Sequence, residues 1–125
     1  MPKPRLLIVD DERELRDVLH EFFEESGYDV IEAADGRVAL ELLENSQVDV
    51  AIVDIFMPGV DGLELLTVLR KRPKSAKIVA ISGGGETQSG DVPLQVARLL
   101  GAHATLEKPF DFEVLLSHVK HCLDA

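Results

Sequence analysis

The stretch "AIVDIFMPGVDG", residues 51–62, runs from apolar residues into a carboxylate, Asp54, and then breaks into Met-Pro-Gly. A short apolar run that stops at turn residues is typical of a buried strand. A carboxylate at the end of such a strand is costly to desolvate by itself. We therefore expect Asp54 to have chemical partners, which must come from other segments that end at the same place.

Five short segments of this kind occur along the chain. They are mostly apolar or β-branched, and they cover residues 5–10, 28–33, 48–54, 76–82 and 102–107. Continuous apolar runs of this length predict strands that are covered on both sides. We interpret them as the five strands of one sheet.

Segments with helical periodicity fill the intervals between these strands. Their apolar residues are Leu15, Val18, Leu19, Phe22, Phe23, Val38, Leu42, Leu43, Leu66, Leu69, Val96, Leu99, Leu100, Leu115, Val119 and Leu123. Gly27 stands where the first helix would stop. Asp91 with Pro93, and Asp111, supply helix-start chemistry for the last two helices. We expect the leucines and phenylalanines on these helices to form the core.

The regular alternation of strand and helix predicts an α/β fold. Parallel neighbours need crossover connections, and these place helices on both faces of the sheet. The 125 residues suffice for one compact domain, and no linker divides them. In open parallel sheets, ligands bind outside the carboxyl ends of the strands. Function should therefore be sought at those ends.

Composition and charge narrow the class of partner. The chain has 13 basic and 23 acidic residues and a formal charge of -10, which disfavours binding to nucleic acid or to an anionic membrane. The single cysteine, Cys122, permits no internal disulfide, and we expect it to be a buried, small apolar residue. No signal peptide is recognisable, and no apolar run approaches the roughly 18 residues of a membrane span. We expect a cytoplasmic protein.

Polar residues stand at four of the five predicted strand ends: Asp10, Asp11 and Glu12 at the first, Asp54 at the third, Ser82 at the fourth and Lys108 at the fifth. Carboxylates gathered at one edge repel each other, and a divalent cation would relieve that repulsion. Oxygen-only ligands and a shallow site suit magnesium better than zinc. With a positive charge from Lys108 and a hydroxyl donor from Ser82, such a site can hold a phosphoryl group.

Four motifs in this order resemble a known family. They are "VDDE" at 9–12, "VDIFMPGVDG" at 53–62, Ser82 at the end of the fourth strand, and "KPF" at 108–110. On alternating strands and helices they are similar to the receiver domain of bacterial two-component response regulators. The resemblance covers essentially the whole chain. It implies a flavodoxin-like, doubly wound (βα)5 fold with strand order 2-1-3-4-5, and one receiver domain over residues 1–125 with no output domain.

The resemblance assigns a role to each strand-end residue. It implies that Asp54 is the phospho-acceptor, that Asp11 ligates Mg²⁺ directly, and that Asp10 does so mainly through water. The backbone carbonyl of Phe56 would also meet the metal. Lys108 would pair with Asp54 and then with the phosphoryl oxygens.

Ser82 would move to hydrogen-bond one phosphoryl oxygen. The implied donor is a phosphohistidine on a sensor histidine kinase or phosphotransfer protein. The chain would catalyse only its own phosphorylation and dephosphorylation and would not act as an enzyme on other substrates.

Three positions depart from the family pattern. Thr105 occupies the place of an aromatic residue whose ring usually moves on phosphorylation. The connection at residues 83–90, "GGGETQSG", is long and rich in glycine, so it is a candidate for the segment that phosphate binding orders, or else a tolerated surface insertion. Phe56 places a large apolar side chain beside the acceptor, where it can restrict the hydrolytic water, so we predict a longer-lived phosphate than in a Phe56→Asn variant.

Output is expected through a protein partner. The family binds its partners through the face formed by its fourth helix, fifth strand and fifth helix. In this chain the fourth helix would begin near residue 91, the fifth strand would cover residues 102–107, and the fifth helix would begin near residue 111. We expect a downstream protein target on that face, and neither direct nucleic-acid nor membrane binding. Whether the chain is a single-domain regulator or a receiver from a longer protein stays open.

Other interpretations remain. Taken singly, Asp11 could cap a helix, Asp54 a turn, and Lys108 could be a solvated charge. A magnesium-dependent aspartyl phosphohydrolase would want an acid where Phe56 stands. A phosphorylation-independent adaptor is made credible by Thr105 and the unusual loop. A flavin-binding protein is disfavoured because the acidic cluster would repel a flavin phosphate.

Overall fold

The strands of one parallel sheet correspond to the five apolar segments. In the computed structural model, which describes residues 2–55, 62–72, 76–83 and 91–124, they are β1 (Arg5–Val9), β2 (Asp29–Ala33), β3 (Val50–Asp54), β4 (Lys77–Gly83) and β5 (Ala104–Lys108). Their order across the sheet is β2-β1-β3-β4-β5, and all neighbouring pairs are parallel. The predicted flavodoxin-like strand order is confirmed.

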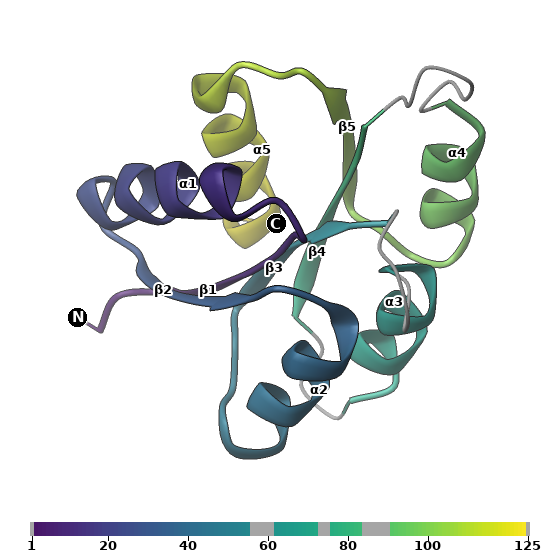
Figure 1. Ribbon diagram of the computed structural model, residues 1–125, viewed down its shortest axis with the longest axis horizontal. Helices are drawn as coiled ribbons and strands as arrows, with labels where there is room; N and C mark the ends of the chain where they lie inside the picture. Colours follow the sequence, from purple (N-terminus) through teal and green to yellow (C-terminus); the bar gives the residue numbers. More distant parts are fainter. Residues whose placement is uncertain (1, 56–61, 73–75, 84–90, 125) are drawn as a thin grey trace.

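Five helices connect these strands: α1 (Arg13–Glu25), α2 (Gly36–Asn45), α3 (Gly62–Arg70), α4 (Asp91–Leu99) and α5 (Phe112–Asp124). Figure 1 shows α1 and α5 on one face of the sheet and α2, α3 and α4 on the other. Both faces of the sheet are therefore covered, as the predicted doubly wound architecture requires.

Alternate residues of the strands pack into two separate hydrophobic cores, one on each face of the sheet. In β3, Val50 and Ile52 pack with α1 and α5, whereas Ala51 and Val53 pack with the three helices of the other face. All five residues of β3 are buried. Burial on both sides explains why the sequence of this strand is a continuous apolar run and does not alternate between apolar and polar residues.

The helix ends follow local chemistry, and two of them bear out the predicted signals. Gly27, just beyond α1, has a φ of 100°, a conformation that favours glycine. Asp111 Oδ1 accepts a hydrogen bond from the Glu113 backbone N–H at 2.8 Å, which caps α5. The sequence did not point to Asp35, whose side chain caps α2 by accepting from the Val38 N–H at 2.9 Å.

One expectation about the core is wrong. Leu99 was expected to be buried, but 85% of its surface is exposed, and Val18 and Val96 are also exposed. Helix α4 meets the sheet through Ala97, which is fully buried, and Leu100 packs against the same core. Leu99 lies two positions from Ala97 and so points away from the sheet, because residues two apart lie on opposite sides of a helix.

Several expectations lie outside the described residues. They concern Phe56, the connection at residues 84–90, and the side chains of Asp91 and Pro93. Within the described ranges, no helix combines the length and the apolar character that a membrane crossing requires. Cys122 lies on α5 and is buried, as expected.

Candidate functional site

The carboxyl ends of β1, β3, β4 and β5 bring the predicted polar residues to one edge of the sheet. Asp54 is the last residue of β3 and pairs in register with Ile81, so that Ser82 lies one position beyond it on β4. Lys108, the last residue of β5, pairs with Gly83. Asp10 follows β1 directly. Parallel strands in register therefore place residues from distant parts of the chain together.

Three carboxylates form the centre of this edge. Asp10 and Asp54 are buried, Asp11 is exposed, and one oxygen from each lies within 4.8 Å of the others. Glu12, not Asp11, occupies the N-cap position of α1, and its side chain makes no capping bond. The alternative that Asp11 caps this helix is therefore wrong. The predicted gathering of these three acids is confirmed.

Asp10 is held from two sides. Its Oδ1 accepts a hydrogen bond from the Glu12 backbone N–H at 2.8 Å, and its Oδ2 lies 2.9 Å from Lys108 Nζ. Burial raises the pKa of Asp10 above its usual value, although the contacts with Lys108 and the Glu12 backbone oppose the rise. A buried carboxyl of this kind favours a nearby cation.

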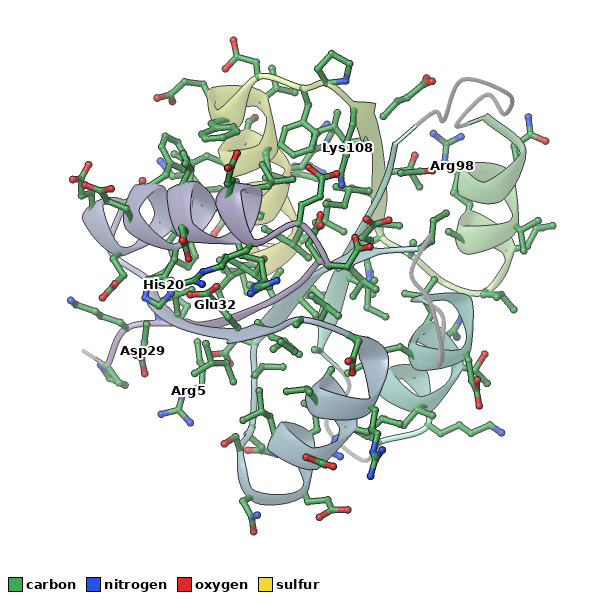
Figure 2. All side chains as sticks on the ribbon, in the orientation of Figure 1. Arg5, His20, Asp29, Glu32, Arg98 and Lys108 are labelled. Carbon is green, nitrogen blue, oxygen red and sulfur yellow. The ribbon has the colours of Figure 1, made fainter. Side chains whose placement is uncertain are left out.

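Lys108 supplies the positive charge of the site (Figure 2). Its Nζ lies 2.9 Å from Asp10 Oδ2, 3.1 Å from Asp54 Oδ2 and 3.1 Å from Glu12 Oε1. Burial lowers the pKa of Lys108, but the hydrogen bond to Asp10 and the charges of Asp54 and Asp10 outweigh it and hold the pKa above its ordinary value. The ammonium therefore stays charged at neutral pH.

Ser82 adds a hydroxyl without an evident structural task. It is fully buried, and its Oγ has no hydrogen-bond partner among the residues that the structure describes. An unsatisfied buried hydroxyl is unfavourable in a folded protein. Its place beside Asp54 suits a donor to an oxygen of a bound group.

Gly62 was not singled out from the sequence, although it lies within the quoted "MPGVDG" stretch. A Cβ at this position would overlap the carbonyl oxygen of Asp54 and the Cα of Ile55. Helix α3 therefore begins against the backbone of the residue that carries the central carboxylate. Only glycine permits this close approach without displacing that backbone.

A polar network below α1 supports the main chain of the site and was also missed. Arg16 Nη1 donates to the Asp10 carbonyl at 2.8 Å, and its Nε donates to Glu32 Oε1 at 3.2 Å. His20 contacts Glu32 and Glu24 at 2.6 Å through its two ring nitrogens. Figure 2 shows His20 next to Glu32. The spacing of Arg16, His20 and Glu24 at i, i+4 and i+8 was the available signal.

Thr105, the position where an aromatic residue was expected, lies on β5 and is half-buried. Its Oγ1 accepts a hydrogen bond from Arg98 Nη2 at 2.9 Å. Arg98 projects from α4 toward this strand (Figure 2). The bond links α4 to β5 at the face that was expected to bind a partner.

Known proteins are similar to this chain in sequence. The family described as "Response regulator receiver domain" matches residues 6–120. Sporulation initiation phosphotransferase F of Bacillus subtilis is 31% identical over 123 residues, which are 98% of this chain and 96% of that protein. The transcriptional regulatory protein CpxR of Escherichia coli is 36% identical over 120 residues, but this chain spans only 49% of its length.

Solved structures agree with the sequence matches. The response regulator receiver domain protein (CheY-like) from Methanospirillum hungatei superposes with a TM-score of 0.88 at 30% identity, over 98% of this chain and 94% of that one. The likeness extends over the whole sheet and both helical layers.

Proposed function

The chain belongs to the response regulator receiver domain family, and we propose that it accepts a phosphoryl group on Asp54 and signals by changing how it binds a protein partner. The observation that carries this proposal is the contact of Asp54 Oδ2 with Lys108 Nζ at 3.1 Å, beside two further carboxylates and the buried hydroxyl of Ser82, which has no partner in the described part of the chain. Members of this family are in general signalling modules and not enzymes. The acidic site is consistent with the metal site of a receiver domain.

Magnesium is the metal that this donor set fits. Asp10, Asp11 and Asp54 offer only hard oxygen ligands within 4.8 Å of one another, with Asp11 open to water. Asp54 and Asp11 would hold the ion directly, Asp10 would act mainly through water, and the Phe56 carbonyl would complete the set. When bound, Mg²⁺ supplies positive charge that offsets the charge of the phosphoryl oxygens.

The transfer balances on these residues. An oxygen of the Asp54 carboxylate attacks phosphorus and forms an O–P bond while the N–P bond of a donor phosphohistidine breaks. The imidazole leaves with the electron pair of that bond. Lys108 and Ser82 then contact the equatorial oxygens, where charge accumulates. Attack of water on the acyl phosphate later releases phosphate and restores the carboxylate.

The donor would be a sensor histidine kinase or a phosphotransfer protein. A buried acceptor between Lys108 and two further acids suits a donor that presents its phosphoryl group from outside the sheet edge. We place the protein in the cytoplasm, where such donors act. We also propose that residues 1–125 form one receiver domain, which is supported by a single sheet and by the family match over 6–120.

Output would run through the face of α4, β5 and α5. Leu99 and Val96 are exposed apolar residues on α4, which suits a protein partner. The formal charge of -10 disfavours nucleic acid and an anionic membrane. The Arg98–Thr105 bond joins α4 to β5 and offers a contact that could be made or broken as the site changes. A comparison of amide exchange over 83–107 with and without a phosphoryl mimic tests this coupling, and unchanged protection would contradict it.

A phosphorylation-independent adaptor is the second candidate. The hydrogen bond from Arg98 to Thr105 favours it. Thr105 has no aromatic ring, and the family usually signals phosphorylation by the movement of such a ring. In that case an Asp54→Asn variant would bind the partner as the wild type does.

Intact mass after incubation with magnesium and acetyl phosphate separates the two candidates. We expect the mass of one phosphoryl group to be added to the wild type and not to Asp54→Asn. An equal adduct on both proteins would contradict the role of Asp54, and no adduct on the wild type would favour the adaptor.

A further inference from the structure

The ammonium group of Lys108 donates hydrogen bonds to Glu12 and Asp54 and makes an ion-pair contact with Asp10. Lysine carries three N–H donors, and three carboxylates already lie against this nitrogen: Asp10 at 2.9 Å, Asp54 at 3.1 Å and Glu12 at 3.1 Å. A phosphoryl oxygen that approaches Lys108 therefore competes with these carboxylates for the ammonium group.

The three carboxylates differ in how freely they can leave. The side chains of Asp10 and Asp54 are 0% and 4% exposed and belong to the ends of buried strands. Glu12 is 62% exposed and stands at the start of α1. Its backbone N–H is held by Asp10, so its side chain can move without disturbing Asp10. Asp54 would itself carry the phosphoryl group, and of the other two carboxylates Glu12 is the one that can move away from Lys108.

The surroundings leave room for that movement. A groove of about 470 Å³ lies beside Glu12 and Lys108. Leu15 and Phe110 are among the other residues that line it. A carboxylate that swings out of contact with Lys108 remains at the water-exposed mouth of this groove, where it keeps its hydration.

We propose that Glu12 is a positioning residue that occupies the place of a phosphoryl oxygen on Lys108 and is displaced when the phosphoryl group arrives. This inference rests on the proposed function of Asp54. In the unphosphorylated protein, Glu12 holds the ammonium over the acidic cluster. It also competes with the incoming group, so that it lowers the affinity of the site for a phosphoryl anion.

The competition depends on the contact between the Glu12 carboxylate and Lys108, and not only on the negative charge of Glu12. Glu12→Gln removes the charge. Glu12→Asp keeps the charge but shortens the side chain by one carbon, which withdraws the carboxylate from Lys108. Glu14→Gln is the matched control, because Glu14 is an exposed acid in the first turn of the same helix and is not among the carboxylates in contact with Lys108.

The experiment is a titration of each protein, residues 1–125, with beryllofluoride, a mimic of the phosphoryl group, in saturating Mg²⁺, followed by NMR. We expect Glu12→Gln and Glu12→Asp to bind about two- to fivefold more tightly than the wild type, the range for the loss of one exposed ion pair. Glu14→Gln should bind like the wild type. In the wild type, the carboxyl carbon resonance of Glu12 should move toward its solvent-exposed value on binding.

The titration distinguishes a failure of the proposed role of Glu12 from a failure of the proposed function. Tighter binding by Glu12→Gln with wild-type binding by Glu12→Asp would show that charge alone acts and would overturn the inference, as would equal binding by all variants. A wild type that binds no beryllofluoride and forms no adduct with acetyl phosphate would overturn the proposed function and this inference with it.

Discussion

Lys108 Nζ lies 3.1 Å from Asp54 Oδ2, although the two residues are 54 positions apart in the chain. The contact joins the carboxyl ends of β5 and β3, between which β4 lies in the sheet. Asp54 thereby keeps a charged partner in a buried place, and the same partner is in position for a phosphoryl oxygen. This pair is the basis of the first prediction.

Lys108→Gln should slow phosphorylation by acetyl phosphate by about 10²-fold or more, the usual effect of removing one stabilising group from a charged transition state. The amide cannot offset charge on the phosphoryl oxygens. The rate is measured by intact mass over time. Lys120→Gln, an exposed change on α5, is the control and should react at the wild-type rate. A wild-type rate in Lys108→Gln would remove this residue from the mechanism.

Arg16→Gln should weaken Mg²⁺ binding by about tenfold, the lower end of the effects seen when a supporting contact behind a metal site is lost. The Asp10 carbonyl would lose its donor, and the peptide between Asp10 and Asp11 would be less firmly oriented. Calorimetric titration with Mg²⁺ measures the affinity directly.

The control for this change is Arg13→Gln. Arg13 lies on the same helix, is largely exposed and pairs only with Asp17 among the described residues. Equal metal affinities for the two variants would mean that the bond from Arg16 to the Asp10 carbonyl does not support the site.

Gly62→Ala should lower the free energy of unfolding by about 1–3 kcal/mol, the usual cost of forcing an extra methyl group into a packed place. The new Cβ would overlap the Asp54 carbonyl oxygen and so displace the backbone of the acceptor. Urea denaturation measures the change. Gly83→Ala, whose Cβ would meet Lys108 Cδ at 3.4 Å, should cost much less, and similar losses in both variants would refute the specific overlap.

His103 makes stability depend on pH at the opposite edge of the sheet. Its Nδ1 accepts a hydrogen bond from the Ile78 backbone N–H at 3.0 Å, which requires an unprotonated nitrogen. Burial first, and then the charges of Lys77 and Arg70, lower the pKa of His103 below the ordinary value of 6.5. The folded state therefore binds this proton less readily than the unfolded state.

The sign follows from that difference. The contribution of His103 is fully present above pH 6.5 and is lost as the pH falls below that value toward the folded-state pKa. In urea denaturation, the wild type should lose more stability between pH 7.5 and pH 5 than His103→Asn, which cannot titrate there. Parallel losses in the two proteins would show that His103 contributes nothing to the pH dependence.

Much of the site could be predicted because a parallel sheet brings the ends of its strands together. Once the apolar runs ending at Asp10, Asp54, Ser82 and Lys108 were interpreted as parallel strands, their meeting at one edge followed from topology alone. The direction in which side chains leave a strand is fixed by a period of two, so few alternatives remained.

The contacts that the sequence could not supply depend on finer geometry. Two of these contacts involve main-chain atoms: the hydrogen bond from Arg16 to the Asp10 carbonyl and the close approach of Gly62 to Asp54. Main-chain contacts cannot be predicted from the pattern of side chains in the sequence. Leu99 was misplaced because the apolar pattern of α4 is short and does not fix the rotation of the helix about its axis. The effect of Phe56 on phosphate lifetime stays a prediction.

Reduction of the phosphorylated protein with borohydride tests the central claim most directly. Borohydride converts an aspartyl phosphate to homoserine, and peptide mass spectrometry then locates the converted residue. We predict homoserine at position 54 and at no other acid, after treatment with magnesium and acetyl phosphate. Conversion at Asp10, Asp11 or another residue, with position 54 still aspartate, would contradict the account.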